Sequence, residues 1–152
     1  ESDPSLQIQA ERIFAHPDED GALWAVRLLN HDDPFLRHAA VQRLSRTTVV
    51  LPHRPPEKLP NAKQRVGTLL AWRSYAWRDR TRFLAAYLKD SDPDVRFLAI
   101  KWVSDEKLVA FRPQIAEMMK QPNLDPRSYV ALATTLARLD GKPASTWFSS
   151  AA

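Results

Sequence analysis

The dipeptide Asp-Pro recurs along the chain and constrains the fold more than any other feature. It stands at residues 3–4, 33–34, 92–93 and 125–126, at intervals of 30, 59 and 33 residues, and Leu59-Pro60 divides the longest interval. Asp accepts hydrogen bonds from the free N–H groups at a helix start, and Pro at the first helical position loses nothing by lacking an N–H. Each copy therefore predicts the start of a helix, and the spacing predicts an internal repeat of about 30 residues.

Alignment of the five copies on their prolines gives columns of matching side chains. The column ten residues after the proline is apolar: Phe14, Leu44, Leu70, Val103 and Leu136. The column eight residues after it is polar: Arg12, Gln42, Thr68, Lys101 and Thr134. Apolar and polar columns at helical spacing, about 3.6 residues per turn, predict an amphipathic helix after each proline.

A further apolar segment precedes most of the copies. Residues 21–30, 81–89 and 113–120 each carry apolar side chains at helical spacing. The predicted repeat is therefore a helix, a short Asp-Pro turn and a second helix. Because a pair of short helices cannot bury its apolar face alone, neighbouring pairs must stack. We expect an all-α fold, a right-handed α-solenoid of about five helix pairs.

Two segments interrupt this pattern. Residues 47–60 hold four prolines, and a proline in a helix interior costs about 3 kcal/mol. An irregular loop is therefore predicted to replace the first helix of the third pair. Residues 142–152 lack an amphipathic period and are predicted to be a linker or a frayed terminus, with Gly141 ending the last helix. The repeat domain is then expected to cover residues 1–141.

The pattern Asp-Pro-x-[Val/Leu]-Arg-x-x-Ala resembles the second helix of HEAT and HEAT-like repeats. Residues 33–40 and 92–99 match it, and the resemblance covers residues 3–139. In such families the Asp and Arg form a buried ladder between successive units, which implies that role for Asp33, Arg37, Asp92 and Arg96. The other copies have Gln7, Lys63 and Tyr129 at the Arg position, which interrupts the ladder.

A narrower resemblance covers residues 95–113 and 139–142. The segments Val95-Arg96-Phe97-Leu98-Ala99-Ile100-Lys101-Trp102-Val103, Phe111-Arg112-Pro113 and Leu139-Asp140-Gly141-Lys142 are similar to the HEAT-like segment of large secreted bacterial proteins. Those proteins join a quinoprotein-like β-propeller, a helical repeat region and a c-type haem domain. The resemblance implies a segment of a multidomain protein of the dehydrogenase and c-type cytochrome kind, located in the periplasm or outside the cell. It implies no haem or quinone role for any residue of this chain.

The sequence offers no recognisable catalytic machinery. The chain has no cysteine and three glycines, and its four histidines do not fall at a metal-ligand spacing. A run of about 18 apolar residues, as a membrane span requires, is absent from the sequence. We predict no catalytic, cofactor-binding or metal-binding residue and no enzymatic activity in this segment, which leaves any redox domain to another part of a parent protein. His31 is predicted to be a solvated residue of an inter-helix turn.

Two sets of residues are candidates for interaction. In a solenoid the second helices line the concave face, so the polar column of Arg12, Gln42, Thr68, Lys101 and Thr134 is either a partner-binding surface or the ordinary solvated side of amphipathic helices. The second set is basic and aromatic: Lys63, Arg65, Trp72, Arg73, Trp77, Arg78, Arg80 and Arg82. Such a set can stack bases and pair with phosphates. Alternatively, a tryptophan fills the gap beside the proline-rich loop and the arginines lie over aromatic faces.

The sequence favours a non-catalytic scaffold that binds a protein or neighbouring domains of its own chain. The alternative is a nucleic-acid-binding domain, and some HEAT-like proteins are DNA glycosylases for alkylated bases, a reading that would use Trp72, Trp77 and Asp79. The net charge of +4 is modest, and its excess of basic residues lies within residues 61–82. Phosphate tracking needs charge along several repeats, which favours the scaffold.

Overall fold

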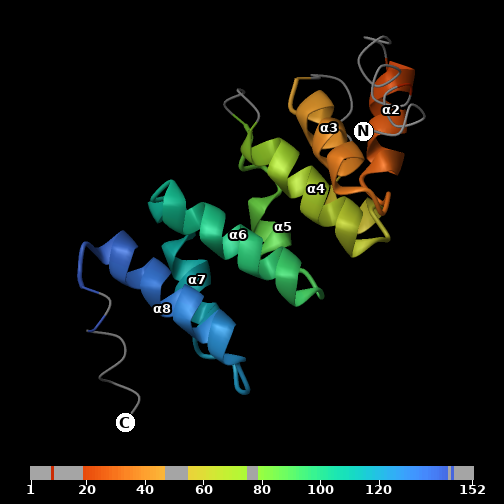
Figure 1. Ribbon diagram of the computed structural model, residues 1–152. Coiled ribbons are helices and arrows are strands. Elements are labelled where there is room, and N and C mark those ends of the chain that lie inside the picture. Colours follow the sequence, from red (N-terminus) through yellow and green to blue (C-terminus); the bar gives the residue numbers. More distant parts are fainter. Residues whose placement is uncertain (1–7, 9–18, 47–54, 75–78, 144, 146–152) are drawn as a thin grey trace. The chain divides into compact units, whose positions relative to one another are not determined.

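The computed structural model describes residues 8, 19–46, 55–74, 79–143 and 145. Within these ranges the chain forms seven α-helices and two short 3-10 helices and contains no strand, which confirms the all-α prediction (Figure 1). Among the described helices, none is long and apolar enough to cross a membrane. The chain divides into two compact units, Glu1–Phe83 and Leu84–Ala152.

The first unit contains three described helices. They are α2 (Glu19–Leu28), α3 (Pro34–Leu44) and α4 (Ala62–Arg73), and a 3-10 helix at Pro56–Lys58 precedes α4. The helix α3 packs against both α2 and α4. Gly67 allows a close approach of α4 to α2, because a Cβ atom there would lie 2.5 Å from Cδ2 of Leu29.

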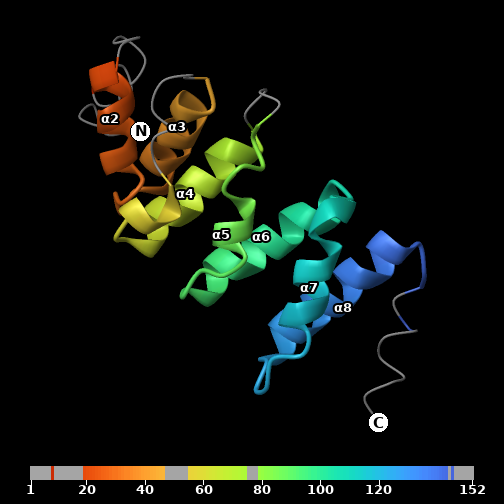
Figure 2. The same ribbon diagram turned by 180° about the vertical axis from the view of Figure 1, so that it is seen from behind.

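The second unit has two layers of helices. It contains α5 (Leu84–Tyr87), α6 (Pro93–Asp105), a 3-10 helix at Val109–Phe111, α7 (Arg112–Met118) and α8 (Pro126–Asp140). The helices α6 and α8 pack side by side, while α5 packs on α6 and α7 packs on α8. Figure 1 views the unit from the side of α6 and α8, and Figure 2 from the side of α5 and α7.

Three of the helix starts follow the Asp-Pro prediction. The side chains of Asp33, Asp92 and Asp125 cap α3, α6 and α8 by accepting hydrogen bonds from backbone N–H groups of the first turn, and a proline opens each helix. The predicted end of the last helix is also confirmed, because Gly141 adopts the left-handed conformation with φ of 65°. The copy that begins at Pro4 lies outside the described residues.

The third copy begins two residues later than its proline predicts. Pro60 precedes the cap, and Asn61 caps α4 by accepting a hydrogen bond of 2.8 Å from the N–H of Lys63. The helix therefore begins at Ala62, and every column of this copy moves by two positions. As a result Thr68, predicted to be polar surface, is fully buried, and Trp72 takes the buried position held by Leu44 in α3.

The core follows the corrected columns. In unit 1 the fully buried large side chains include Leu29, Leu44, Leu69 and Trp72. In unit 2 they include Leu84, Tyr87, Leu88, Ile100, Trp102 and Ile115. With α4 aligned on Asn61, the positions of Leu44, Trp72, Val103 and Leu136 coincide, and all four side chains are buried. The neighbouring column of Val41, Leu69, Ile100 and Ala133 is likewise apolar and buried in all four helices.

Candidate interaction surfaces

An arginine four residues after the cap holds the turn that precedes each of three helices. Arg37 donates from Nη1 to the carbonyl oxygens of His31 and Asp32, both at 2.7 Å. Arg96 donates in the same way to Asp90 and Ser91, at 2.7 and 2.8 Å. Arg65 donates to Leu59 and Pro60, at 3.0 and 3.1 Å. We call this arrangement the arginine bracket.

The bracket replaces the expected ladder between repeats. The carboxylates of Asp33 and Asp92 accept hydrogen bonds from the first turn of their own helices, and the guanidinium groups of Arg37 and Arg96 bind the carbonyl groups of their own turns. The described bonds of these four side chains therefore stay within one helix pair. A carboxylate that caps its own helix start has backbone N–H groups within immediate reach, which favours the local partner.

Arg65 is a residue that the proline alignment missed. That alignment placed Lys63 in the Arg column, whereas alignment on the capping residue Asn61 places Arg65 there. The signal was present in the sequence, because Asn is among the preferred residues for a helix cap.

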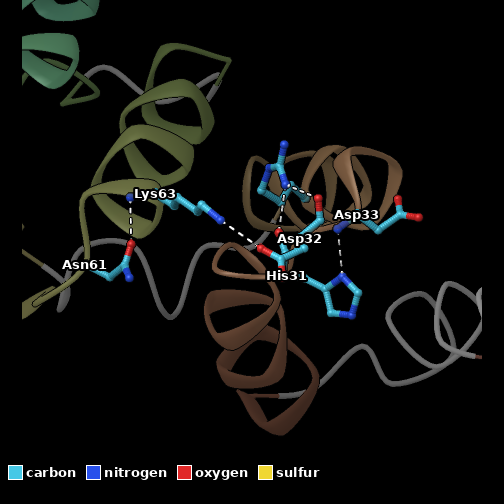
Figure 3. A network of polar contacts seen from close by, with 6 residues as sticks. His31, Asp32, Asp33, Asn61 and Lys63 are labelled. Carbon is cyan, nitrogen blue, oxygen red and sulfur yellow. Dashed lines mark hydrogen bonds and ion pairs between the residues drawn. The ribbon is translucent and has the colours of Figure 1, made fainter.

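The turn before α3 carries a wider polar network, which Figure 3 shows from close by. The Nδ1 atom of His31 accepts a hydrogen bond of 3.0 Å from the backbone N–H of Asp33. In the second unit, Oδ1 of Asp90 accepts the corresponding bond from Asp92, at 2.9 Å. His31 lies in the turn between α2 and α3, as predicted, but it is half-buried and receives a backbone bond rather than being fully solvated.

Two ion pairs connect helix starts. One joins the start of α4 to the turn before α3, and the other joins the start of α8 to the first turn of α6. In unit 1, Nζ of Lys63 lies 2.9 Å from Oδ1 of Asp32 (Figure 3), and this hydrogen bond holds the pKa of the Asp32 carboxyl below its usual value. In unit 2, Nη1 of Arg127 lies 2.7 Å from Oδ1 of Asp94. The Arg127 guanidinium also lies over the ring of Phe97, 3.8 Å from its centre. Both pairs join neighbouring second helices near their N-termini.

The α7–α8 hairpin is held differently. Arg112 at the start of α7 makes a bidentate contact with Asp140 at the end of α8, through Nε at 2.5 Å and Nη2 at 2.9 Å. This contact lowers the pKa of the Asp140 carboxyl, chiefly through the hydrogen bonds from Arg112, and raises that of the guanidinium. Tyr129 stands at the bracket position of α8, so this turn lacks the arginine.

A groove of about 710 Å³ runs between α6 and α8. Apolar and small side chains line it, among them Phe97, Ile100, Val130 and Ala131. Its lining also includes three basic residues, Lys101, Arg127 and Arg138, and one carboxylate, Asp105. Lys101 and Asp105 lie 3.6 Å apart on one helix. The groove therefore combines an apolar floor with a mainly basic rim.

The polar column of the sequence is only partly a surface. Lys101 and Thr134 are exposed and both line the α6–α8 groove, so the structure brings these two together. Gln42 is half-buried, Thr68 is fully buried, and Arg12 lies outside the described residues. The burial of Thr68 removes it from any interaction surface and follows from the two-residue shift of α4.

The basic and aromatic set does not form an open stacking platform over its described residues. Trp72 is 2% exposed and packs edge-on against Phe83, with the ring centres 5.5 Å apart. Arg82 lies over the same Phe83 ring at 5.3 Å and 4.0 Å from Asp79. Arg80 donates a hydrogen bond to the carbonyl oxygen of Arg73, at 3.1 Å. Trp77 and Arg78 lie outside the described residues.

In the part of the chain that the structure describes, no group of three or more His, Asp or Glu side chains is placed to hold a metal ion. Comparisons of the chain with protein-family models, with curated proteins and with solved structures find no match.

Proposed function

We propose that this chain is a non-catalytic scaffold, a segment of a HEAT-like α-solenoid that binds a second protein or a neighbouring part of its own polypeptide. The observation that carries the proposal is the recurrence of one turn. An Asp or Asn cap and an arginine bracket four residues after it stand at equivalent positions of α3, α4 and α6. A unit repeated with its turn chemistry intact is typical of chains built by stacking helix pairs, whose extended faces bind partners.

The packing of second helices supports the same proposal. The helices α3 and α4 pack together in unit 1, and α6 and α8 pack together in unit 2. Each pair carries an ion pair near its N-termini, Lys63–Asp32 in one unit and Arg127–Asp94 in the other. Within unit 2 the side-by-side packing of α6 and α8 leaves a groove along their shared face, the kind of surface that a partner can bind.

Site-specific photo-crosslinking in the native host tests the scaffold proposal. A photoreactive amino acid replaces Thr134, which is exposed on the α6–α8 side, or Ala85, which is exposed on α5, or Phe35, which is 81% exposed at the start of α3. A discrete adduct from at least one position, identified by mass spectrometry as one protein or as another region of the same chain, is the expected result. Failure of all three positions to give an adduct would contradict the scaffold.

We further propose that the chain belongs to a secreted bacterial multidomain protein, as its similarity over residues 95–113 and 139–142 implies. The complete reading frame tests this part alone. A β-propeller encoded before the segment and a Cys-x-x-Cys-His motif encoded after it are the expected result, and a short gene with neither would contradict it.

A further inference from the structure

We propose that the α6–α8 groove binds an acidic peptide segment that carries an apolar side chain. The inference deepens the scaffold proposal, on which it rests, by naming the surface and the chemistry of the partner. It is carried by the shape of the groove, by the charge of its rim and by its length.

The floor of the groove is suited to an apolar side chain. Ile100 and Thr135 form buried parts of it, and Phe97 and Ala131 are half-buried. Val130 stands beside them and is 49% exposed. Apolar surface that remains open to water gains free energy when covered, roughly 25 cal/mol for each Å². A leucine, isoleucine or phenylalanine side chain laid between the helices would cover this surface.

The rim of the groove is suited to carboxylates. Lys101, Arg127 and Arg138 line the groove with a single acidic residue, Asp105, and Arg127 is paired with Asp94 outside the lining, at 2.7 Å, so the positive charge that remains for a partner centres on Arg138 and Lys101. Arg138 is exposed and makes no ion pair with any described residue. Lys101 pairs with Asp105 on the surface, at 3.6 Å. Because exposed pairs of this kind are worth only about 0–1 kcal/mol, Lys101 can exchange its partner for an arriving carboxylate.

The length of the groove favours a short extended peptide. Along α8 its lining begins at Pro126 and ends at Arg138, which at 1.5 Å per residue is roughly 18 Å. An extended chain advances about 3.3 Å per residue, so about five or six residues span the groove. Arg138 lies near one end without an ion pair to any described residue, whereas Arg127 near the other end is paired with Asp94. A matching segment therefore carries an acidic residue toward the Arg138 end and an apolar residue beside it.

The same features disfavour a nucleic acid at this place. Phe97 is the aromatic side chain of the groove lining, and the Arg127 guanidinium already covers its ring at 3.8 Å. Base stacking requires a free aromatic face.

Selection from a phage-displayed library of random heptapeptides on the complete chain tests the proposal. We expect enrichment of peptides that combine Asp or Glu with Leu, Ile or Phe. A fluorescein-labelled synthetic copy of the enriched sequence is then titrated with the protein and followed by fluorescence anisotropy. Binding should weaken as salt is raised, because exposed charge pairs are screened.

Two kinds of variant place the bound peptide. The charge reversals Arg138→Glu and Lys101→Glu should each weaken binding by about tenfold or more. Thr134→Trp, at an exposed position of the lining, should weaken it by filling the groove. Lys89→Glu is the matched control, because Lys89 is an exposed lysine that lies outside the groove lining. Circular dichroism shows whether each variant is folded.

The outcomes separate this proposal from the general one. Absence of enrichment, enrichment of basic peptides, or enriched peptides that bind Arg138→Glu and Thr134→Trp as tightly as the unchanged chain would overturn the groove. If crosslinked adducts still form from Ala85 or Phe35, the scaffold proposal survives that result. If no position gives an adduct and yet the library selects acidic, apolar peptides that the variants reject, the groove stands as a peptide site and the scaffold in the native host does not.

Discussion

Arg37 donates a hydrogen bond of 2.7 Å from Nη1 to the carbonyl oxygen of His31, so a side chain of α3 fixes the turn that precedes this helix. Arg96 and Arg65 do the same for α6 and α4. Each bracket closes within its own helix pair and needs no acidic partner from the next pair. The conformation of each turn is therefore fixed by bonds to its own helix and does not depend on the neighbouring helix pair.

Loss of one bracket should destabilise the unit that contains it. Arg96→Ala leaves the carbonyl groups of Asp90 and Ser91 without their charged donor, and hydrogen bonds to charged groups contribute about 1.5–3 kcal/mol. We expect the midpoint of urea unfolding, followed by circular dichroism, to fall accordingly. The midpoint of Arg96→Lys should lie between those of Arg96→Ala and the unchanged chain, because an ammonium group replaces the planar guanidinium. Lys89→Ala, at an exposed lysine, is the control, and an Arg96→Ala midpoint equal to that of the control would refute the role.

The bond from Asp33 N–H to His31 should tolerate one substitution and reject another. His31→Asn supplies a side-chain oxygen at the position where Asp90 supplies one in the second unit. His31→Ala supplies none and should lower the free energy of unfolding by about 1 kcal/mol. The two melting temperatures decide the matter. Equal losses in both variants would show that the acceptor atom is unimportant.

Thr68→Val should stabilise the protein. Thr68 is fully buried in α4, and its hydroxyl oxygen has no hydrogen-bond partner among the described residues. A methyl group in place of an unsatisfied buried hydroxyl should raise the free energy of unfolding by about 1 kcal/mol. Thr135→Val is the matched control, because the Thr135 hydroxyl donates to the carbonyl oxygen of Ala131 at 2.6 Å. Equilibrium unfolding should therefore show a gain for Thr68→Val and none for the control.

Acid should weaken the α7–α8 hairpin through Asp140. Hydrogen bonds from Arg112 hold the pKa of Asp140 below its usual value of 3.8. A carboxyl whose pKa is depressed by folding contributes stability that is present above the usual value and is lost as the pH falls through the folded value. The melting temperatures of the unchanged chain and Asp140→Asn should differ near about pH 6 and converge toward about pH 2. A difference that stays constant over this range would exclude the ion pair as its cause.

We expect single-stranded and duplex DNA to show no tight binding to this chain, even at low salt. Trp72 lies in the core of unit 1, and Arg65 and Arg80 hold backbone carbonyl groups. Anisotropy of labelled single-stranded and duplex DNA, measured at about 20 and 150 mM salt, tests this expectation. Tight binding at low salt that falls steeply at the higher concentration would instead support the nucleic-acid alternative.

The helix starts could be predicted from sequence because Asp and Pro act locally. Asp33 and Asp92 cap helices using atoms of the next few residues, and no distant contact is needed to infer it. The start of α4 could not be fixed in this way, since Pro60 before a cap and a proline after a cap look alike in a one-dimensional alignment. In the structure Asn61 caps the helix. A helix that starts there has Thr68, Leu69 and Trp72 on its buried face.

The partners of Asp33 and Arg37 could not be predicted from their spacing. A pair of opposite charges four residues apart is compatible with a bond between repeats and with two separate local roles. Distances decide between these, and both side chains bind backbone groups nearby. The groove itself was not predicted, and only two members of the polar column, Lys101 and Thr134, line it, because the groove depends on the packing of α6 against α8.

The turn between α7 and α8 is the place where this fold should best tolerate an insertion or a cut in the chain. It has no arginine bracket, its residues Gln121 to Asn123 are exposed, and Asn123 adopts a φ of 63°. An insertion at these residues would leave the Arg112–Asp140 contact in place. A protease that cut it would leave two helices still clasped at their far ends by Arg112 and Asp140, so the nicked polypeptide would keep its fold and gain a pair of new termini.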